Sequence, residues 1–340
     1  MDHHRKAVRV GKAAIAVALI FRLWTAGLPG KILTWLTQPN IAAFLIYLET
    51  GRDVRFSASQ EVFLAYPPES APPLILLPPE IPEELPPEKV PLPVFLPEDT
   101  ALTDLYYACS LRPELEELLT APLSWNLADG SPTVLILHTH TTESYTQAGE
   151  NYVETSEYRT LDENYNMLSI GARVAEILSE NGIGVIQDRN LHDYPSYNGS
   201  YNDARSAIQS YLQAYPGIQL VLDLHRDAIE TTGGQLRTLA DLEGQPCAQL
   251  MLVMGTNASG LTHENWQDNL SLALKLQAQL EKLFPGITRP TILRGQRFNQ
   301  DLHSGALLVE VGAAGNTHRE AMLAAEALAQ AIITLAKGTK

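Results

Sequence analysis

The chain has 340 residues, 45% of them hydrophobic, and a formal net charge of −15 with a pI near 5.0. This is enough chain for one sizeable folded domain with additional segments. The acidic balance argues against a nucleic-acid-binding protein, which needs a basic surface. The two cysteines, Cys109 and Cys247, lie far apart and form no Cys-x-x-Cys pair. They exclude a disulfide framework and a cysteine zinc site, and leave open whether they form one bridge or two free thiols.

Residues 1–50 have the pattern of a short cytoplasmic tip followed by a membrane anchor. Four basic residues precede the apolar run AAIAVALIF, and a second uncharged run covers residues 32–48. A spanning helix needs roughly 20 mainly apolar residues, and Arg22 and Pro39 interrupt the two runs. The basic start favours a cytoplasmic N-terminus before an uncleaved single-pass anchor. An amphipathic helix packed on the domain is the alternative. Residues 51–66 follow as a juxtamembrane segment.

From residue 67 to 98 the composition changes to PPESAPPLILLPPEIPEELPPEKVPLPVFLPE. Proline fixes the backbone and lacks an amide donor, so this segment predicts neither a helix nor a central strand. It favours a polyproline II spacer that rises about 3.1 Å per residue. We interpret it as a stalk between the membrane and a more distant substrate. Residues 99–130 then connect the stalk to a folded domain over residues 131–340, which the residues described below identify as the expected catalytic domain.

The domain alternates strand-like and helix-like segments. The predicted elements in chain order are a strand at 133–137, a helix near 164–181, a strand at 183–188, a helix near 203–214, a strand at 218–225, a hairpin around Gly244, a strand at 247–255, a helix near 264–284, a strand at 306–312 and a helix near 318–335. Continuous apolar strands that alternate with amphipathic helices predict an α/β fold. Its sheet is expected to be mainly parallel, with helices on both faces.

Polar side chains follow or end three of these strands, and in such a sheet ligands bind beyond the carboxyl ends of the strands. The side chains are His138, His140 and Glu143 after TVLIL, His225, Arg226 and Asp227 at the end of LVLDL, and Glu310 within ALLVEVG. Two imidazoles and one carboxylate are a common ligand set of catalytic zinc. We therefore predict that His140, Glu143 and His225 bind Zn²⁺, and that Glu310 acts as general base and acid in amide hydrolysis.

Further residues near these strand ends are candidates for supporting roles. Asp162, ahead of the first helix, is the alternative to Glu143 as third ligand, while His138 and Arg226 lie next to ligands that they could orient. His192 belongs to the tyrosine-rich loop HDYPSYNGSY. The candidates for substrate contacts are His192, Arg294 and Arg297. An arginine there would form a forked contact to a substrate carboxylate.

Six segments together resemble the stage II sporulation protein P family: YLETGR, ILHTHTTESY, RTLDENYNML, HDYPSYNGSY, LDLHRDA and RFNQDLHSGALLVEVG. They run in order from Tyr47 to about Asn316. The family consists of cell-wall hydrolases of endospore-forming bacteria, related to zinc-dependent N-acetylmuramoyl-L-alanine amidases. The resemblance implies an amidase-like fold that cleaves the amide between muramic acid and the stem peptide, and also stem-peptide cross-links.

The resemblance also implies site residues, partners and a location. His140 and His225 match the two zinc histidines and Glu310 the catalytic glutamate, whereas the zinc glutamate of the amidases lies nearer Asp162 than Glu143. The family implies a single-pass anchor in the septal membrane of the mother cell, with the catalytic domain outside the cytoplasm. It implies sporulation proteins D and M of the same stage as partners, D being a transglycosylase that acts on the denuded glycan. A zinc carboxypeptidase and a non-catalytic wall-binding scaffold are the alternative functions.

Overall fold

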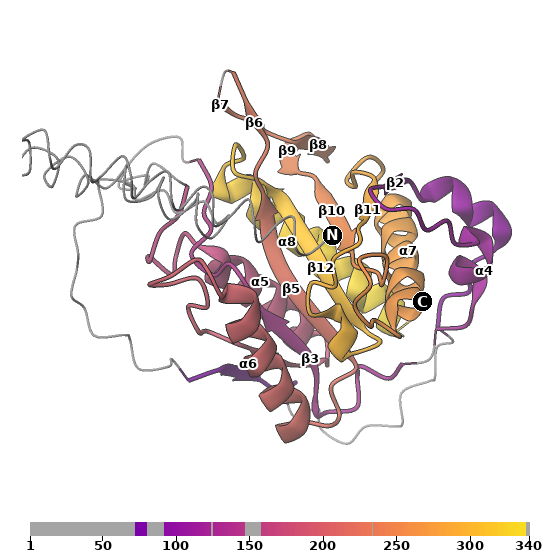
Figure 1. Ribbon diagram of the computed structural model, residues 1–340, viewed down its shortest axis with the longest axis horizontal. Helices are drawn as coiled ribbons and strands as arrows, with labels where there is room; N and C mark the ends of the chain where they lie inside the picture. Colours follow the sequence, from indigo (N-terminus) through magenta and orange to yellow (C-terminus); the bar gives the residue numbers. More distant parts are fainter. Residues whose placement is uncertain (1–71, 80–91, 124, 147–157, 233, 338–340) are drawn as a thin grey trace, which may run out of the picture. The chain divides into compact units, whose positions relative to one another are not determined.

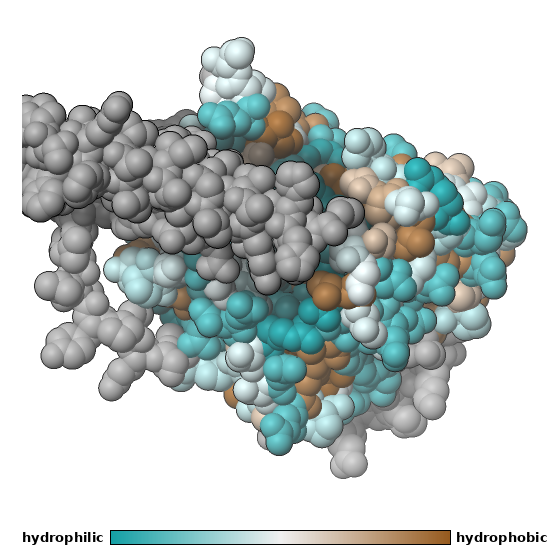
Figure 2. Space-filling model, viewed as in Figure 1, coloured by the Kyte–Doolittle hydropathy of each residue, from teal (hydrophilic) through white to brown (hydrophobic). Residues whose placement is uncertain are grey.

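The computed structural model describes residues 72–79, 92–123, 125–146, 158–232 and 234–337. The expected anchor, the juxtamembrane segment and most of the expected stalk lie outside these residues. Within the described ranges, no helix is both long enough and apolar enough to span a bilayer. Figure 2 shows one face of the molecule, where hydrophilic residues predominate and hydrophobic ones gather in small separate patches.

The described residues contain an eight-stranded sheet with the order β1-β4-β3-β5-β12-β10-β11-β2. Its strands are β1 (Leu74–Leu76), β2 (Leu105–Tyr107), β3 (Pro132–Leu137), β4 (Gly184–Gln187), β5 (Leu220–Asp227), β10 (Leu250–Met254), β11 (Thr291–Leu293) and β12 (Ala306–Ala313). Only the pairs β1–β4 and β10–β12 are antiparallel, and the remaining neighbours are parallel. The predicted α/β fold with a mainly parallel sheet is confirmed.

Helices cover both faces of this sheet, as predicted (Figure 1). They are α4 (Leu115–Thr120), α5 (Met167–Glu180), α6 (Ser200–Ala214), α7 (Trp266–Leu283) and α8 (His318–Lys337), with 3₁₀ helices η1 (Pro97–Leu102) and η2 (Gln300–Leu302). The end of α5 shows why the helix boundaries could be predicted. Gly182 has a φ of 83°, and the amides of Gly182 and Ile183 donate to the carbonyls of Ser179 and Leu178. This is a Schellman motif, which favours glycine at that position.

Two small hairpins follow β5. They are β6 (Glu230–Thr231) with β7 (Gly234–Gln235), and β8 (Leu239–Leu242) with β9 (Gln245–Ala248). The first projects beyond the end of β5 (Figure 1). In the second, Glu243 and Gly244 both have positive φ, 53° and 82°, as the favoured two-residue hairpin turn requires. The hairpin predicted around Gly244 is confirmed.

Alternate residues of the central strands enter different cores, because side chains along a strand point to opposite faces. Val134, Ile136, Leu222, Leu224 and Val309 belong to the core under α5, α7 and α8. Leu135, Leu137 and Val221 pack instead with Ala204 and Ile208 of α6. Asp223, His225 and Asp227 alternate in step with Val221 along β5. They therefore lie on the face of the sheet that α6 covers in part.

The folded unit begins earlier than the sequence indicated. The apolar residues LILL allow β1 to form within the proline-rich segment, where it pairs antiparallel with β4 at the edge of the sheet. Prolines are tolerated beside an edge strand, because the amides on its outer side need no partner in the sheet. At the other edge, β2 pairs with β11. Parts of the expected stalk and connecting segment are thus integral to the sheet.

Both cysteines are free thiols, Cys109 being partly buried and Cys247 fully buried. Cys247 lies on β9, where its Sγ is 3.9 Å from the backbone carbonyl oxygen of Glu320. Burial raises the pKa of Cys247 to about 12, so the reactive thiolate is suppressed at neutral pH. This cysteine has the environment of a structural residue.

A buried lysine joins α4 to α7. Lys275 is 2% exposed, and its Nζ donates to the carbonyl of Leu118 at 2.8 Å and to Ser271 Oγ at 2.7 Å. Ser271 Oγ itself donates to the Leu118 carbonyl at 2.6 Å. Burial lowers the pKa of Lys275 to about 8, because desolvation disfavours the charged ammonium.

We expect Lys275→Met to raise the free energy of unfolding at pH 7 by on the order of 1–3 kcal/mol. The ammonium destabilises the folded state fully below pH 8, and this cost disappears as the pH rises toward the unfolded-state pKa of 10.5. The Leu118 carbonyl keeps its bond from Ser271. Urea unfolding between pH 7 and 10 should show the advantage of the variant shrinking. A variant that is less stable at pH 7, or a difference that does not change with pH, would contradict this expectation.

Candidate active site

The strands that carry the predicted residues are immediate neighbours. β3, β5 and β12 are adjacent and parallel, so their carboxyl ends meet at one edge of the sheet. Glu310 of β12 lies in register with His225 of β5. The ring of His140, from the loop after β3, has its centroid 5.2 Å from that of His225. The structure thus brings His140, His225 and Glu310 together.

His140 lies in a pocket of aromatic rings. Its imidazole stacks on Tyr197 with the centroids 4.5 Å apart, and the edge contact with Tyr201 is at 5.5 Å. The Tyr197 hydroxyl is 3.1 Å from His140 Nε2. Burial lowers the pKa of His140 to about 4, so the ring is neutral at physiological pH. Its Nδ1 is buried and has no hydrogen-bond partner among the described residues.

Glu143 is 5% exposed and lies between cationic groups. Its Oε2 is 3.7 Å from His225 Nδ1 and accepts from the backbone amide of Arg226 at 3.3 Å. Its Oε1 is 3.6 Å from the guanidinium groups of both Arg226 and Arg159. Burial alone would raise the pKa of Glu143, but Arg226 and the histidines outweigh burial and lower it. The side chain is therefore an ionised carboxylate beside His225.

The alternative third ligand, Asp162, lies elsewhere. Its side chain is exposed, and its Oδ1 accepts from the backbone amide and the side-chain amide of Asn164 at 3.0 and 2.9 Å. Such a turn, in which an aspartate bonds two residues ahead, is common before a helix. The structure places Glu143, and not Asp162, next to the two histidines.

His225 lies between two carboxylates. Its Nε2 is 3.0 Å from Asp223 Oδ1, on the side opposite Glu143. Asp223 is held in turn by Thr139, whose backbone amide and hydroxyl donate to it at 2.8 and 2.6 Å. Burial would lower the pKa of His225, but the two carboxylates outweigh it and raise the pKa to about 10. This environment favours a cation at the imidazole, whether a proton or a metal ion.

Glu310 has the properties of a proton carrier. Its Oε2 is buried without a hydrogen-bond partner among the described residues. Burial raises the pKa of Glu310 to about 8 against the opposing charge of His225, and the carboxylates of Glu143 and Asp227 add to the rise. A group whose pKa lies near the working pH can both take up and release a proton.

His138 does not join the group. β3 ends at Leu137 and a turn follows, so His138 and His140 do not lie in one continuous strand. His138 Nδ1 is 3.1 Å from the Leu224 carbonyl, and its Nε2 is 3.1 Å from Gln187 Nε2. The ring lies under α5, where a Cβ on Gly171 would come within 2.5 Å of it. It thus supports the backbone next to His225 from the opposite face.

Arg226 and His192 are buried and bonded within the protein. Arg226 Nε and Nη2 donate to the carbonyls of Ser144 and Tyr158, both at 3.0 Å, so that its guanidinium fixes the loop carrying Glu143. His192 Nε2 is 2.7 Å from Asp188 Oδ2. These bonds are consistent with an orienting role for Arg226, whereas the hydrogen bonds of His192 go to Asp188 and Thr141.

The two arginines predicted to contact substrate lie outside this cluster. β11 runs opposite to β12, so Arg294, which follows β11, lies toward the edge where β12 begins. Arg294 is exposed. Arg297 Nη1 is 3.2 Å from Asp301 Oδ2 and 3.3 Å from the Thr262 carbonyl. β10 and β11 thus end at the edge of the sheet opposite to the carboxyl ends of β3, β5 and β12.

Sequence reasoning missed residues that the fold brings to the site. Asp223 could have been found, because it precedes His225 by two in a strand and must share its face. Tyr197 and Tyr201 belong to the tyrosine-rich segment HDYPSYNGSY already noted, Tyr197 in the loop and Tyr201 in the first turn of α6. Arg159 had no such signal, since its place beside Glu143 depends on an isolated bridge between the two backbones.

The donor set fits zinc. His140 and His225 offer imidazole nitrogens and Glu143 offers a carboxylate, and these are common ligands of zinc. The 3.7 Å between Glu143 Oε2 and His225 Nδ1 is close to the roughly 3.4 Å between two ligands of a tetrahedral zinc ion. The unpaired Nδ1 of His140 is a further open donor. The match to zinc is therefore one of donor types, because within the described part of the chain no three His, Cys, Asp or Glu side chains lie close enough together to hold a metal ion as they stand.

We expect Arg226→Met to lower the free energy of unfolding by about 3 kcal/mol, because it leaves the buried Glu143 carboxylate with fewer cationic partners. Urea unfolding of the full chain at pH 7 measures this change. Arg112→Met is a matched control, because Arg112 is exposed and contacts only local carbonyls and the ring of Tyr107; its effect should stay within about 1 kcal/mol. Equal effects of the two substitutions would show that Arg226 is not a structural support.

Solved structures of amidases are among the similar proteins. The N-acetylmuramoyl-L-alanine amidase AmiC2 of Nostoc punctiforme is 15% identical over 60% of this chain and 98% of its own, with a TM-score of 0.36. The CwlD amidase of Clostridioides difficile, in complex with the GerS lipoprotein, is 14% identical over 60% and 98%, with a TM-score of 0.39. Ami1 of Mycobacterium smegmatis is 13% identical over 63% and 100%, with a TM-score of 0.35.

Sequence relatives are more specific. Stage II sporulation protein P of Bacillus subtilis (strain 168) is 28% identical over 207 residues. That match covers 58% of this chain and about half, 49%, of the relative. The family model of stage II sporulation protein P matches residues 96–333, which include every residue of the cluster around His225. The chain therefore belongs to the stage II sporulation protein P family.

Proposed function

We propose that the protein is a zinc-dependent peptidoglycan hydrolase of sporulation, an N-acetylmuramoyl-L-alanine amidase that also cleaves stem-peptide cross-links. The observation that carries this proposal is the position of Glu310, whose Oε2 is buried, in register with His225 and beside the donors of the proposed zinc site. Burial raises the pKa of Glu310 to about 8. Family membership supports the cell wall as the substrate.

His140, Glu143 and His225 would hold the zinc ion. When bound there, zinc would supply Lewis-acid polarisation of the scissile carbonyl and lower the pKa of water. Asp223 lies 3.0 Å from His225 Nε2, although the contact lacks hydrogen-bond geometry, and it would orient the ring as carboxylates behind metal-binding histidines do. Arg226 keeps Glu143 ionised and in place.

Glu310 performs the proton transfers. As the carboxylate it takes a proton from the attacking water, and as the acid it delivers that proton to the leaving amide nitrogen. The site is walled by Tyr197 and Tyr201, which raise the apolar character around His140. Exclusion of water strengthens every charged interaction made during the reaction.

The wider setting is also a proposal. The basic residues and apolar runs of residues 1–50 support a single-pass anchor in the septal membrane of the mother cell, with the domain outside the cytoplasm. Sporulation proteins D and M of the same stage are the proposed partners. Protein D would act on glycan from which this enzyme has removed the stem peptides.

The first test is zinc content and digestion of purified peptidoglycan by the full chain, with Glu310→Gln and His225→Ala alongside. We expect one zinc ion per wild-type chain and the release of stem peptides with new muramic-acid ends. Glu310→Gln should keep zinc and lose activity by about 10²- to 10⁴-fold, because only the proton transfer is removed. His225→Ala should lose both zinc and activity.

Glu117→Gln, an exposed carboxylate on α4, is the matched control and should match the wild type. An active Glu310→Gln variant would contradict the assigned mechanism. Cleavage confined to short peptides with free C-termini would indicate the carboxypeptidase alternative. A folded wild-type protein without zinc that releases nothing from the wall would indicate a scaffold.

A separate prediction concerns Asp223. We expect Asp223→Asn to weaken zinc binding by about 10- to 100-fold, because the neutral amide no longer orients and polarises His225. Competition with a chromogenic chelator measures the affinity without any need for turnover. Unchanged affinity in a folded variant, judged by circular dichroism, would show that Asp223 only supports the loop at Thr139.

A further inference from the structure

Arg289, which the proposed mechanism does not use, forms an ion pair with Asp227 at the end of β5. Arg289 Nη1 is 2.8 Å from Asp227 Oδ2, and the two side chains are only 14% and 25% exposed. Its Nε and Nη2 are buried and have no hydrogen-bond partner among the described residues. Buried guanidinium nitrogens are normally paired, since an unpaired buried donor costs free energy.

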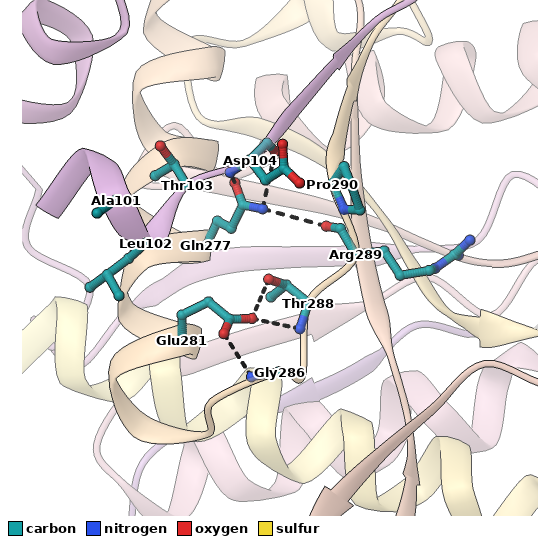
Figure 3. A pocket seen from close by; sticks show the side chains of 10 residues that line it. All are labelled: Ala101, Leu102, Thr103, Asp104, Gln277, Glu281, Gly286, Thr288, Arg289 and Pro290. Atoms are coloured by element: carbon teal, nitrogen blue, oxygen red, sulfur yellow. Dashed lines mark hydrogen bonds between the residues drawn. The ribbon is translucent and has the colours of Figure 1, made fainter.

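The backbone of Arg289 is fixed while its side chain extends away. The Arg289 amide donates to the Leu250 carbonyl at 2.8 Å, and Gln277 Nε2 donates to the Arg289 carbonyl at 3.4 Å. Gln277 and Glu281 line a hollow of about 230 Å³, and Figure 3 shows the side chain of Arg289 directed away from both. The guanidinium thus belongs to the surroundings of Asp227 rather than to that hollow.

Strand register places this guanidinium beside the proposed reaction centre. Met251, Glu310 and His225 lie in one row across β10, β12 and β5. Asp227 follows His225 by two residues, on the same face and about 6–7 Å further along the strand. The Arg289 side chain therefore meets β5 at Asp227, just beyond the row of Met251, Glu310 and His225. Its charge also opposes the rise in the pKa of Glu310, which agrees with a position near that carboxyl.

The free edge of the guanidinium has the shape of a carboxylate site. Nε and Nη2 point along one edge and can donate two parallel hydrogen bonds to the two oxygens of one carboxylate. Asp227 occupies Nη1 and so fixes the orientation of the planar group. Nε and Nη2 lie below the surface, and shielding from bulk water strengthens a charged pair formed there. A carboxylate has to displace the groups that now cover this edge, while 14% of the Arg289 side chain is exposed.

We propose that Arg289 binds a carboxylate of the stem peptide, borne by the second residue after the scissile amide. This inference rests on the proposed function and adds a substrate preference to it. An extended peptide advances about 3.3 Å per residue, so two residues cover the estimated distance from His225 to Asp227. In the stem peptide, the second residue is a glutamate linked through its side chain, and its α-carboxylate is free in some cell walls and amidated in others.

The test compares two muramoyl dipeptides that differ only at this position, one with the free α-carboxylate and one with the α-carboxamide. Calorimetry with the full-length Glu310→Gln protein, loaded with zinc, measures binding without turnover. We expect the carboxylate to bind at least about tenfold more tightly, and Arg289→Met in the same background to abolish this preference. Affinity for the carboxamide should change by less than about threefold, which also reports that the variant is folded.

Two further variants sharpen the result. Arg289→Lys keeps the charge but not the two-pronged edge, so it should retain only part of the preference. Arg112→Met, the exposed control, should retain all of it. Equal binding of the two ligands, no binding of either ligand, or a preference that survives in Arg289→Met would overturn the proposal. Arg289 would then be only a counter-charge of Glu310, seen as a shifted pH profile of hydrolysis.

The outcomes for the two proposals are separable. If the wild type digests no peptidoglycan but Glu310→Gln still prefers the carboxylate, the hydrolase proposal fails and the Arg289 site stands. If the wild type releases stem peptides but shows no preference between carboxylate and carboxamide walls or ligands, the hydrolase proposal stands and the Arg289 site fails.

Discussion

The imidazole of His225 lies between two buried carboxylates, and the remainder of the site depends on this arrangement. Asp223 contacts one ring nitrogen and Glu143 approaches the other. Each carboxylate is compensated in turn, Asp223 by the hydroxyl and amide of Thr139 and Glu143 by Arg226. Because an uncompensated buried charge is costly, these groups stabilise the folded protein only as a complete set. The same set concentrates negative charge where a divalent cation would reside.

The parallel order of β3, β5 and β12 makes that network possible. β3 delivers its polar groups in the loop after Leu137, whereas β5 and β12 carry Asp223, His225 and Glu310 within the strands, on one face of the sheet. The opposite direction of β10 and β11 has a second effect. The start of β10 and the residues before β11 lie at the edge where β3, β5 and β12 end. Arg289, which precedes β11, therefore reaches this edge from the side of β12 opposite to β5. Strands of both directions thus bring side chains to the same edge of the sheet.

Much of this arrangement could be predicted from local patterns. Apolar strands that change abruptly to histidine and glutamate located His140, His225 and Glu310, and the periodicity of the helices located α5 to α8 within a few residues. What could not be predicted depends on contacts distant in sequence. The end of β3 at Leu137 decided the side on which His138 lies, and the antiparallel step between β12 and β10 moved Arg294 away. The short strand β1 escaped notice because the prolines around LILL dominate the local signal.

The position of β1 has a mechanical consequence. It is the first strand of the sheet in chain order, and it is attached to β4 by a ladder of three residue pairs, Leu74 with Gln187, Ile75 with Ile186 and Leu76 with Val185. A pulling force transmitted along the chain from residues before Leu74 reaches the sheet first at this ladder. So short an edge ladder gives way at a lower load than the long central pairs β3–β5 and β5–β12. Tension would therefore be relieved at the rim of the domain before it could disturb the spacing of His140, His225 and Glu310.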